Sequence, residues 1–454
     1  MSLVKKINIL VNFILCIFYI GTFNAFAQPQ FNSPYSKYGL GEIQDVYFAQ
    51  GIGLGRLGAS TRDYNHLNVV NPASFGFLKT STFEMGLYGS YTNSTISSQQ
   101  ANVWGGNLSY IAIGVPTKNQ ISQFIDKKKS PYSWGLGFSL QPYSSVGYDI
   151  SINDSSDTTL GTINHRFQGG GGAYRLMMSN GVKYKNFALG LNLGYLFGEL
   201  NESYIFSYSD QANTYTYYDN TLNDLALSGL TYNLGAMYDY QLKTKDKDGK
   251  KVASNKHFVF GATWGSKQKI GVNNDYLFTR ERILSSSVQD KDTIAIRENA
   301  KYKATLPSEW SIGTQFEIEN KLRVGINYSG SQWSDYVNPA KLDTLNNAFN
   351  FSVGVEYTPN YISYNNYLEK IRYRLSYNYG KDPRIIKGES LTRTSATIGF
   401  GFPIILPRQQ TSFINLSVEA GQYKTPTNIN DKFIKATIGF TMNDNSWFYK
   451  RRYN

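Results

Sequence analysis

Four cationic residues fall in segments whose apolar and polar residues alternate. In an extended segment alternate residues share one face, so these cations point to the same side. They are Arg323, Arg372, Arg374 and Lys435. A row of cations on an enclosed face attracts an anionic head group, which makes these four the candidate ligand-binding residues. Three acidic residues, Glu317, Glu356 and Glu419, fall on the same face, so internal ion pairing is the competing and favoured interpretation.

The sequence contains no recognisable catalytic pattern. Its three histidines, His66, His165 and His257, have no carboxylate or hydroxyl neighbours at a recognisable spacing. The motifs Gly-x-Ser-x-Gly and His-Glu-x-x-His are also absent. We therefore expect that the protein is not an enzyme and holds neither a metal nor a cofactor. Carboxylates that meet across strands leave a lipase- or protease-like barrel as the alternative.

Residues 1–27 have the three parts of a secretory signal peptide. Two lysines precede an apolar stretch over residues 7–23, and a small-residue cleavage site ends at Ala27. The single cysteine, Cys16, lies within this segment. We expect the mature chain to begin at Gln28 without cysteine, which excludes disulfides, thiol catalysis and metal sites with cysteine ligands.

The composition favours a β-barrel in a membrane. Of the 454 residues, 15% are aromatic and 17% are charged, whereas soluble domains average about 25% charged residues. A mean hydropathy of −0.37 argues against membrane helices, and the abundant aromatic residues argue against disorder. The net charge is +12, but the basic residues are scattered, so we expect no nucleic acid partner. We expect a transmembrane barrel in the bacterial outer membrane.

Alternation of apolar residues with small or polar residues marks about fourteen strands, an even number as a closed single-chain barrel needs. In one of them, Leu189 and Leu191 flank Gly190. The predicted strands cover residues 82–92, 106–115, 133–149, 165–185, 187–208, 225–242, 257–270, 305–318, 321–336, 348–358, 369–380, 393–403, 411–421 and 433–442. Alternation also fits a soluble β-sandwich, but the signal peptide and the low charge favour the antiparallel barrel.

The lengths of the connections indicate which side of the membrane each one faces, because barrels have short periplasmic turns and longer outer loops. Lys185-Asn186 and Glu319-Asn320 are very tight and fall where periplasmic turns are expected. The longest irregular stretches, 209–224 and 271–304, are expected to be outer loops. Connections 116–132 and 243–256 exceed the expected length, so they contain extra structure or their strand ends are misplaced.

Residues 28–80 precede the first strand and do not alternate. We expect this segment to fold into the lumen as a hatch or plug, followed by the barrel over 81–442 and a basic periplasmic tail over 443–454. The glycine-rich run 51–58 lacks the Lys-Ser/Thr of a phosphate-binding loop, so we do not expect nucleotide binding. The candidate gating residues of the plug are Asn71, Pro72 and Ala73.

The order of several short motifs resembles that of the FadL-type outer-membrane transporters of hydrophobic compounds. These motifs are the glycine-rich run with Asp63, Asn71-Pro72-Ala73-Ser74, Thr82-Phe83-Glu84, Gly169-Gly170-Gly171-Gly172, Leu306-Pro307-Ser308 and Gln332-Trp333-Ser334-Asp335-Tyr336. The opening at 32–41 and the tail at 447–452 are similar to a Bacteroidota branch of the family. The resemblance covers nearly the whole mature chain. It departs at the end, where a basic tail follows Met442 instead of the terminal aromatic residue usual in other phyla.

The resemblance implies passive uptake of hydrophobic or amphipathic small molecules through a lumen gated by the plug. The implied partners are outer-membrane lipid and a fatty-acid-like ligand. A second hypothesis is a non-transporting accessory subunit of a larger outer-membrane machine, either the type 9 secretion translocon or the barrel-assembly complex. Its partners would be other outer-membrane or periplasmic proteins. The sequence does not separate these two functions.

Overall fold

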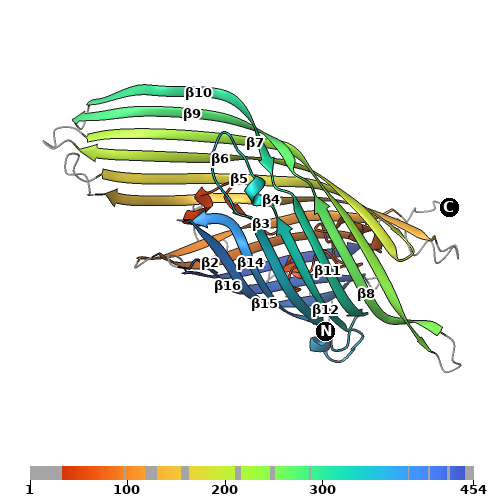
Figure 1. The fold of residues 1–454 in the computed structure, drawn as a ribbon. Helices are drawn as coiled ribbons and strands as arrows, with labels where there is room; N and C mark the ends of the chain where they lie inside the picture. Colours follow the sequence, from red (N-terminus) through yellow and green to blue (C-terminus); the bar gives the residue numbers. More distant parts are fainter. Residues whose placement is uncertain are drawn as a thin grey trace, which may run out of the picture.

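The computed structural model describes residues 33–96, 99–117, 130–154, 163–209, 216–245, 251–285, 288–386, 388–406, 410–426 and 430–444. They form an antiparallel β-barrel that closes because β17 pairs with β2 (Figure 1). The predicted signal peptide and residues 445–454 of the predicted tail lie outside the described residues. The predicted fold class is confirmed: closure pairs the backbone groups that a membrane cannot hydrate.

Within the described ranges, sixteen strands make fourteen staves of the barrel. Two staves contain two strands each: β8 (Lys251–Gly265) continues into β9 (Gln268–Ser285), and β10 (Val288–Leu306) continues into β11 (Glu309–Ile318). The strand β7 pairs with both β8 and β9. The other staves are β2 (Ser81–Ile96), β3 (Gln99–Pro116), β4 (Tyr132–Asp154), β5 (Ile163–Tyr184), β6 (Phe187–Ser209), β7 (Thr216–Lys245), β12 (Leu322–Ser331), β13 (Ala348–Tyr357), β14 (Arg372–Ile386), β15 (Glu389–Leu406), β16 (Gln410–Lys424) and β17 (Asn430–Asp444).

One side of the barrel is much taller than the other. Strands β4 to β7 and the β9–β10 hairpin project beyond the remaining strands (Figure 1). The expectation that 209–224 and 271–304 are irregular loops is therefore wrong, since β7 begins at Thr216 and β9 pairs with β10. Residues 290–299 are all exposed. A strand with water on both faces needs no apolar alternation, so the pattern did not reveal this hairpin.

Two connections, 116–132 and 243–256, are longer than expected for periplasmic turns, and the structure accounts for the second. Residues 243–245 belong to β7 and residues 251–256 belong to β8, so the predicted strand ends were misplaced there. In the connection 116–132, residues 118–129 lie outside the described residues.

The alternation along the strands separates a lipid-facing surface from the lumen, as predicted. On β6, Leu189 and Leu193 are 54% and 46% exposed, whereas Asn192 between them in the wall is buried. A chain of contacts between aromatic rings runs across β11 to β14. It lies near the ends of these strands that point toward the β9–β10 hairpin. It consists of Trp310, Tyr328, Phe349 and Tyr379. Such rings form the aromatic girdle of a membrane barrel at the interface with water.

The two predicted tight turns are present. Lys185 lies between β5 and β6 with a φ of 51°, and Asn320 lies between β11 and β12 with a φ of 56°. The first turn has two residues, 185–186, and the second has three, 319–321. Positive φ at these positions lets such short turns follow the twist of the paired strands.

The segment before β2 contains four short elements, η1 (Pro34–Lys37), β1 (Glu42–Ile43), α2 (Ala49–Gly53) and η2 (Pro72–Phe77). Several of its apolar side chains are buried, including those of Ile52, Leu54 and Leu57. β1 pairs with β4, and α2 packs on β15 and β16 across the lumen. Two further short helices, η3 (Trp333–Asp335) and η4 (Tyr367–Lys370), lie in connections. Among the described residues, no helix is long and apolar enough to cross a membrane.

Candidate functional site

Asn71 fixes the start of η2, where the candidate gating residues lie. Its side chain is fully buried and caps the helix, because Oδ1 accepts a hydrogen bond from the Ala73 amide at 3.1 Å. Its Nδ2 donates to the carbonyl of Ala59 at 2.6 Å and to that of Ala236 on β7 at 3.1 Å. Pro72 follows at the first helical position, where its missing N–H costs no hydrogen bond. These contacts tie the segment both to itself and to the wall.

A row of four glycines in the wall makes room for η2. They lie opposite one another on adjacent strands, in the order Gly135, Gly181, Gly190 and Gly235. A Cβ atom on Gly190 would lie 2.3 Å from the Ala73 nitrogen, and one on Gly235 would lie 2.1 Å from Asn71 Oδ1. Because the first of these neighbours is backbone, a side chain at Gly190 must displace the helix. We call these four residues the glycine row.

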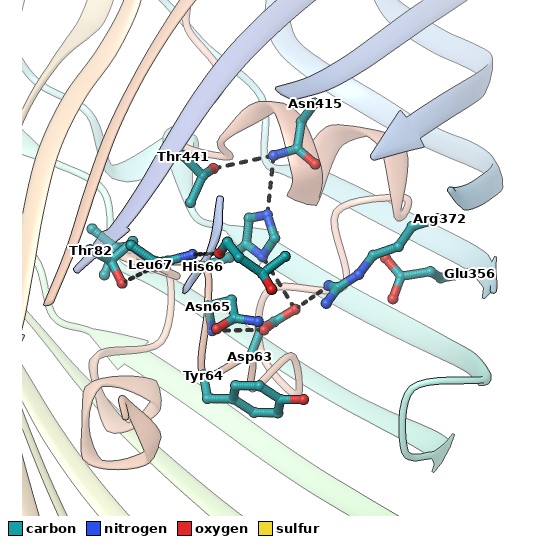
Figure 2. Close-up of polar contacts among 12 residues, drawn as sticks. Asp63, Tyr64, Asn65, His66, Leu67, Thr82, Glu356, Arg372, Asn415 and Thr441 are labelled. Carbon is teal, nitrogen blue, oxygen red and sulfur yellow. Dashed lines mark hydrogen bonds and ion pairs between the residues drawn. The ribbon is translucent and has the colours of Figure 1, made fainter. Parts of the chain in front are cut away.

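A second set of contacts surrounds Asp63 (Figure 2). Its Oδ2 accepts a hydrogen bond from Arg372 Nη1 at 2.8 Å and lies 3.4 Å from His66 Nδ1. Arg323 on β12 approaches the same oxygen to 3.7 Å. Burial opposes ionisation of Asp63, but the guanidinium of Arg372, the N–H of His66 and the more distant guanidinium of Arg323 hold its pKa well below the usual range. Asp63 is therefore a buried anion that joins the segment to β12 and β14.

The contacts of Asp63 continue through His66 to strand β16. Asn415 on β16 accepts a hydrogen bond from Arg374 Nη1 at 2.9 Å, which orients its amide so that Nδ2 donates to His66 Nε2 at 3.1 Å. The remaining ring nitrogen, Nδ1, then carries the proton that faces Asp63. Burial lowers the pKa of His66, which agrees with a neutral ring held between Asp63 and Asn415.

The wall cations themselves are paired across strands. Arg323 Nη2 lies 3.2 Å from Glu317, and its Nη1 lies 3.1 Å from Glu356. Arg374 Nε donates to the other oxygen of Glu356 at 2.6 Å. Glu356 thus joins β12, β13 and β14 through one carboxylate.

A third set of contacts holds the glycine-rich run. Arg56 has a φ of 57° and pairs with Asp45 and with Glu419 of β16, each at 2.8 Å. Arg393 lies 2.7 Å from the other oxygen of Glu419, and Lys435 lies 3.7 Å from Asp45. A buried ion pair contributes little more stability than an apolar contact would. Removal of one partner, however, leaves the other charge buried and unpaired, which is strongly destabilising. These pairs therefore specify the position of the segment.

All four candidate ligand-binding residues lie on the lumen side within ion-pair distance of a carboxylate. The ion pairing that the sequence favoured is thus present in the structure. A role of Arg323, Arg372, Arg374 or Lys435 in ligand binding stays a prediction. The candidate gating residues Asn71, Pro72 and Ala73 come together at the glycine row, and their gating role also stays a prediction.

Sequence reasoning missed several of these contacts. It gave the histidines no polar neighbours, but His257 Nδ1 lies 2.8 Å from Asp239 and His165 Nδ1 lies 2.7 Å from the Tyr204 hydroxyl. Arg56 was also missed, although it is the one charged residue in the run 51–58. Among the described residues, no group of three or more His, Cys, Asp or Glu side chains is placed to hold a metal ion.

A protein-family model described as BamG matches residues 3–454. Solved structures with similar folds include the toluene transporter TbuX of Ralstonia pickettii, with 13% identity and a TM-score of 0.52 over 87% of this chain and 98% of that one. A FadL homologue of Pseudomonas aeruginosa has 12% identity and a TM-score of 0.53 over 88% and 99%. The toluene transporter TodX of Pseudomonas putida has 14% identity and a TM-score of 0.53 over 88% and 98%. No curated protein matches the sequence. At these identities the likeness shows the fold, that of an outer-membrane β-barrel similar to the FadL channels.

Proposed function

Because the chain belongs to the BamG family, we propose that it is a non-transporting accessory subunit of the barrel-assembly complex in the outer membrane. The family assignment favours this complex over the type 9 secretion translocon. On this proposal the barrel serves as a rigid body that contacts other outer-membrane proteins.

The observation that carries the proposal is the way the N-terminal segment is held in the lumen. It is anchored at three separate places: η2 at the glycine row, Asp63 at Arg372, and Arg56 at Glu419. The backbone of the segment also packs directly on the wall, since a Cβ on Gly354 of β13 would lie 2.0 Å from the Leu54 carbonyl. A gate must move out of the lumen at a low cost in free energy. Release of this segment would instead leave several buried charges without their partners. The lumen therefore suits a structural role.

Passive uptake of hydrophobic molecules is the competing function, and the fold likeness to hydrocarbon channels is the observation that supports it. Uptake needs an apolar pocket from which the plug can withdraw. The candidate cations would then contact an anionic head group, which requires them to exchange their present carboxylate partners.

The test is purification of the tagged, full-length chain from native membranes in mild detergent, followed by mass spectrometry of what accompanies it. The accessory role predicts recovery of the central barrel-assembly subunit in near-constant ratio to the chain. Recovery of the barrel alone with bound lipid or fatty acid would instead support uptake and contradict the accessory role.

A further inference from the structure

A cavity of about 300 Å³ lies where the barrel wall is interrupted. Its lining includes Ser266 and Pro307, which fall in the gaps between β8 and β9 and between β10 and β11. Opposite these gaps, residues 229–233 of β7 have no ladder pairs with either β8 or β9. The cavity also reaches lumen-facing residues of β5, β6 and β7. The cavity therefore extends from the lumen to the wall at the level where the pairing of β7 with β8 and β9 is interrupted.

Two opposite charges line this cavity, Arg175 on β5 and Glu309 at the start of β11. Within the described part of the chain, neither makes an ion pair, unlike the cations around Asp63 and Arg56. The guanidinium of Arg175 lies 5.3 Å from the centre of the Tyr143 ring, and its Nε is buried without a hydrogen-bond partner among the described residues. The side chain of Arg175 is half-buried, whereas Glu309 is exposed. The partly buried charge of Arg175 costs free energy unless something satisfies it.

Two amide oxygens in the same lining also lack partners in the described residues. They are Oδ1 of Asn192 on β6 and Oδ1 of Asn233 on β7. Asn192 is 3% exposed, and its Nδ2 donates to the Val69 carbonyl at 2.8 Å, which fixes the orientation of the amide. The cavity thus offers the guanidinium of Arg175 as a donor and the side-chain oxygens of Glu309, Asn192 and Asn233 as acceptors. Two other charged residues line it: Asp45, which is paired with Arg56, and Lys381.

We propose that this cavity binds a small zwitterion that carries a phosphate or carboxylate and a primary ammonium. The anion pairs with the planar guanidinium of Arg175. The N–H donors of the ammonium suit the two unpartnered amide oxygens and the carboxylate of Glu309. A volume of about 300 Å³ lies at the lower end of the range of ligand sites, which suits one head group. This site is independent of the accessory role proposed above.

The height of the cavity admits two sources for this zwitterion. Trp310 belongs both to the aromatic girdle and to the cavity lining, so the interrupted wall lies at the membrane interface. A phosphoethanolamine head group of a lipid, or free phosphoethanolamine, has the required chemistry. The two sources differ in whether an acyl chain must follow through the wall.

The experiment uses the full-length chain in detergent micelles and titrates it with phosphoethanolamine by calorimetry. We expect saturable binding, and at least tenfold weaker binding of phosphocholine, because its quaternary nitrogen has no N–H to donate. In lipid nanodiscs, native mass spectrometry should retain phosphatidylethanolamine in preference to phosphatidylglycerol if the source is lipid. Binding in either arm supports the zwitterion site. Binding in neither arm, or equal binding of phosphocholine, overturns it and leaves a cavity filled by water.

Variants locate the site. Arg175→Gln and Glu309→Gln should each weaken phosphoethanolamine binding at least tenfold. Asn233→Ala removes one acceptor without a change of charge and should give a smaller loss in the same direction. The matched control is Glu281→Gln, which removes a carboxylate of the tall hairpin that is paired with Lys291 and should leave binding unchanged. Folding is checked by the shift in gel mobility on heating. Folded variants that bind like the unaltered chain would place the ligand elsewhere and overturn the proposal.

Discussion

The carboxylate of Asp63 lies 2.8 Å from the guanidinium of Arg372, and this contact joins the N-terminal segment to a strand 309 residues later in the chain (Figure 2). Both groups belong to a buried polar cluster that also includes the guanidinium of Arg323 and the neutral ring of His66. The positions of the N-terminal segment and of the wall are thereby specified together, because both charges are largely withdrawn from water.

Loss of the Asp63 charge should destabilise the protein strongly. In Asp63→Asn, Arg372 keeps its charge in a buried site, and breakage of such a pair costs about 3–5 kcal/mol. The measurement is urea unfolding in detergent, followed by tryptophan fluorescence. The control is Asp149→Asn on β4, whose partner Arg166 is about half exposed, so the cost should stay below about 1 kcal/mol. Equal losses in the two variants would contradict the anchoring role.

A methyl group in the glycine row should displace η2. Gly190→Ala places a Cβ 2.3 Å from the Ala73 nitrogen, and such overpacking costs about 1–3 kcal/mol. We expect faster hydrogen exchange of the η2 amides and faster proteolysis after the helix. Gly170→Ala on β5 is the control, because a Cβ there meets nothing within 4 Å. If the η2 amides exchange as slowly in both alanine variants as in the unaltered chain, the glycine row does not determine the position of the helix.

The tall hairpin should be dispensable for closure of the barrel. β8 and β11 pair directly over ten residue pairs without help from β9 and β10. Deletion of residues 276–298 joins Asp275 to Asn299, whose amide already donates to the Asp275 carboxylate at 2.6 Å. We expect the shortened chain to keep the heat-dependent gel mobility of a folded barrel. A chain that never shows this mobility would mean that the hairpin is needed for folding.

The fold around Asp343, in the β12–β13 connection, should lose stability as pH rises. The Gly39 amide donates to Asp343 Oδ2 at 2.8 Å, and burial raises the pKa of Asp343 against the opposing charge of Lys341. The neutral carboxyl is favoured in the folded state. The contribution of Asp343 to the free energy of unfolding is therefore fully present below its ordinary pKa of 3.8. It is lost as the pH rises through the higher pKa that Asp343 has in the folded protein.

Hydrogen exchange of the Gly39 amide measures this effect, once corrected for the intrinsic rate at each pH. Protection should be higher in acid than at neutral pH. In Asp343→Asn the amide oxygen accepts the same hydrogen bond at every pH, so the corrected protection should be flat. A slope that survives in this variant would assign the effect to another group.

The membrane part of the fold could be predicted from the sequence because lipid imposes a two-residue period. Leu189 and Leu193 face lipid and Asn192 faces the lumen, so the pattern of β6 is readable without a structure. The hairpin over 268–306 was not predicted, since its residues 290–299 are exposed to water and carry charge at irregular positions. The breaks between β8 and β9 and between β10 and β11 were missed for a similar reason. At each break the chain passes from the membrane-spanning part of the wall to the part that is exposed to water.

The candidate site could be predicted only in part. The wall cations were found because alternation places Arg323 and Arg374 in the lumen, and their carboxylate partners on neighbouring strands followed from the same rule. Partners that come from the plug could not be found this way. Asp63 and Arg56 lie in an aperiodic segment, and their contacts with Arg372 and Glu419 depend on how that segment folds back.

Depletion of the chain from living cells tests the central claim most directly. The measurement is the amount of folded outer-membrane barrels by quantitative mass spectrometry, alongside uptake of a labelled fatty acid. An accessory subunit of the barrel-assembly complex predicts a fall in other folded barrels, restored by the unaltered chain, with no specific loss of uptake. Unchanged barrel levels together with a specific loss of uptake would contradict the account.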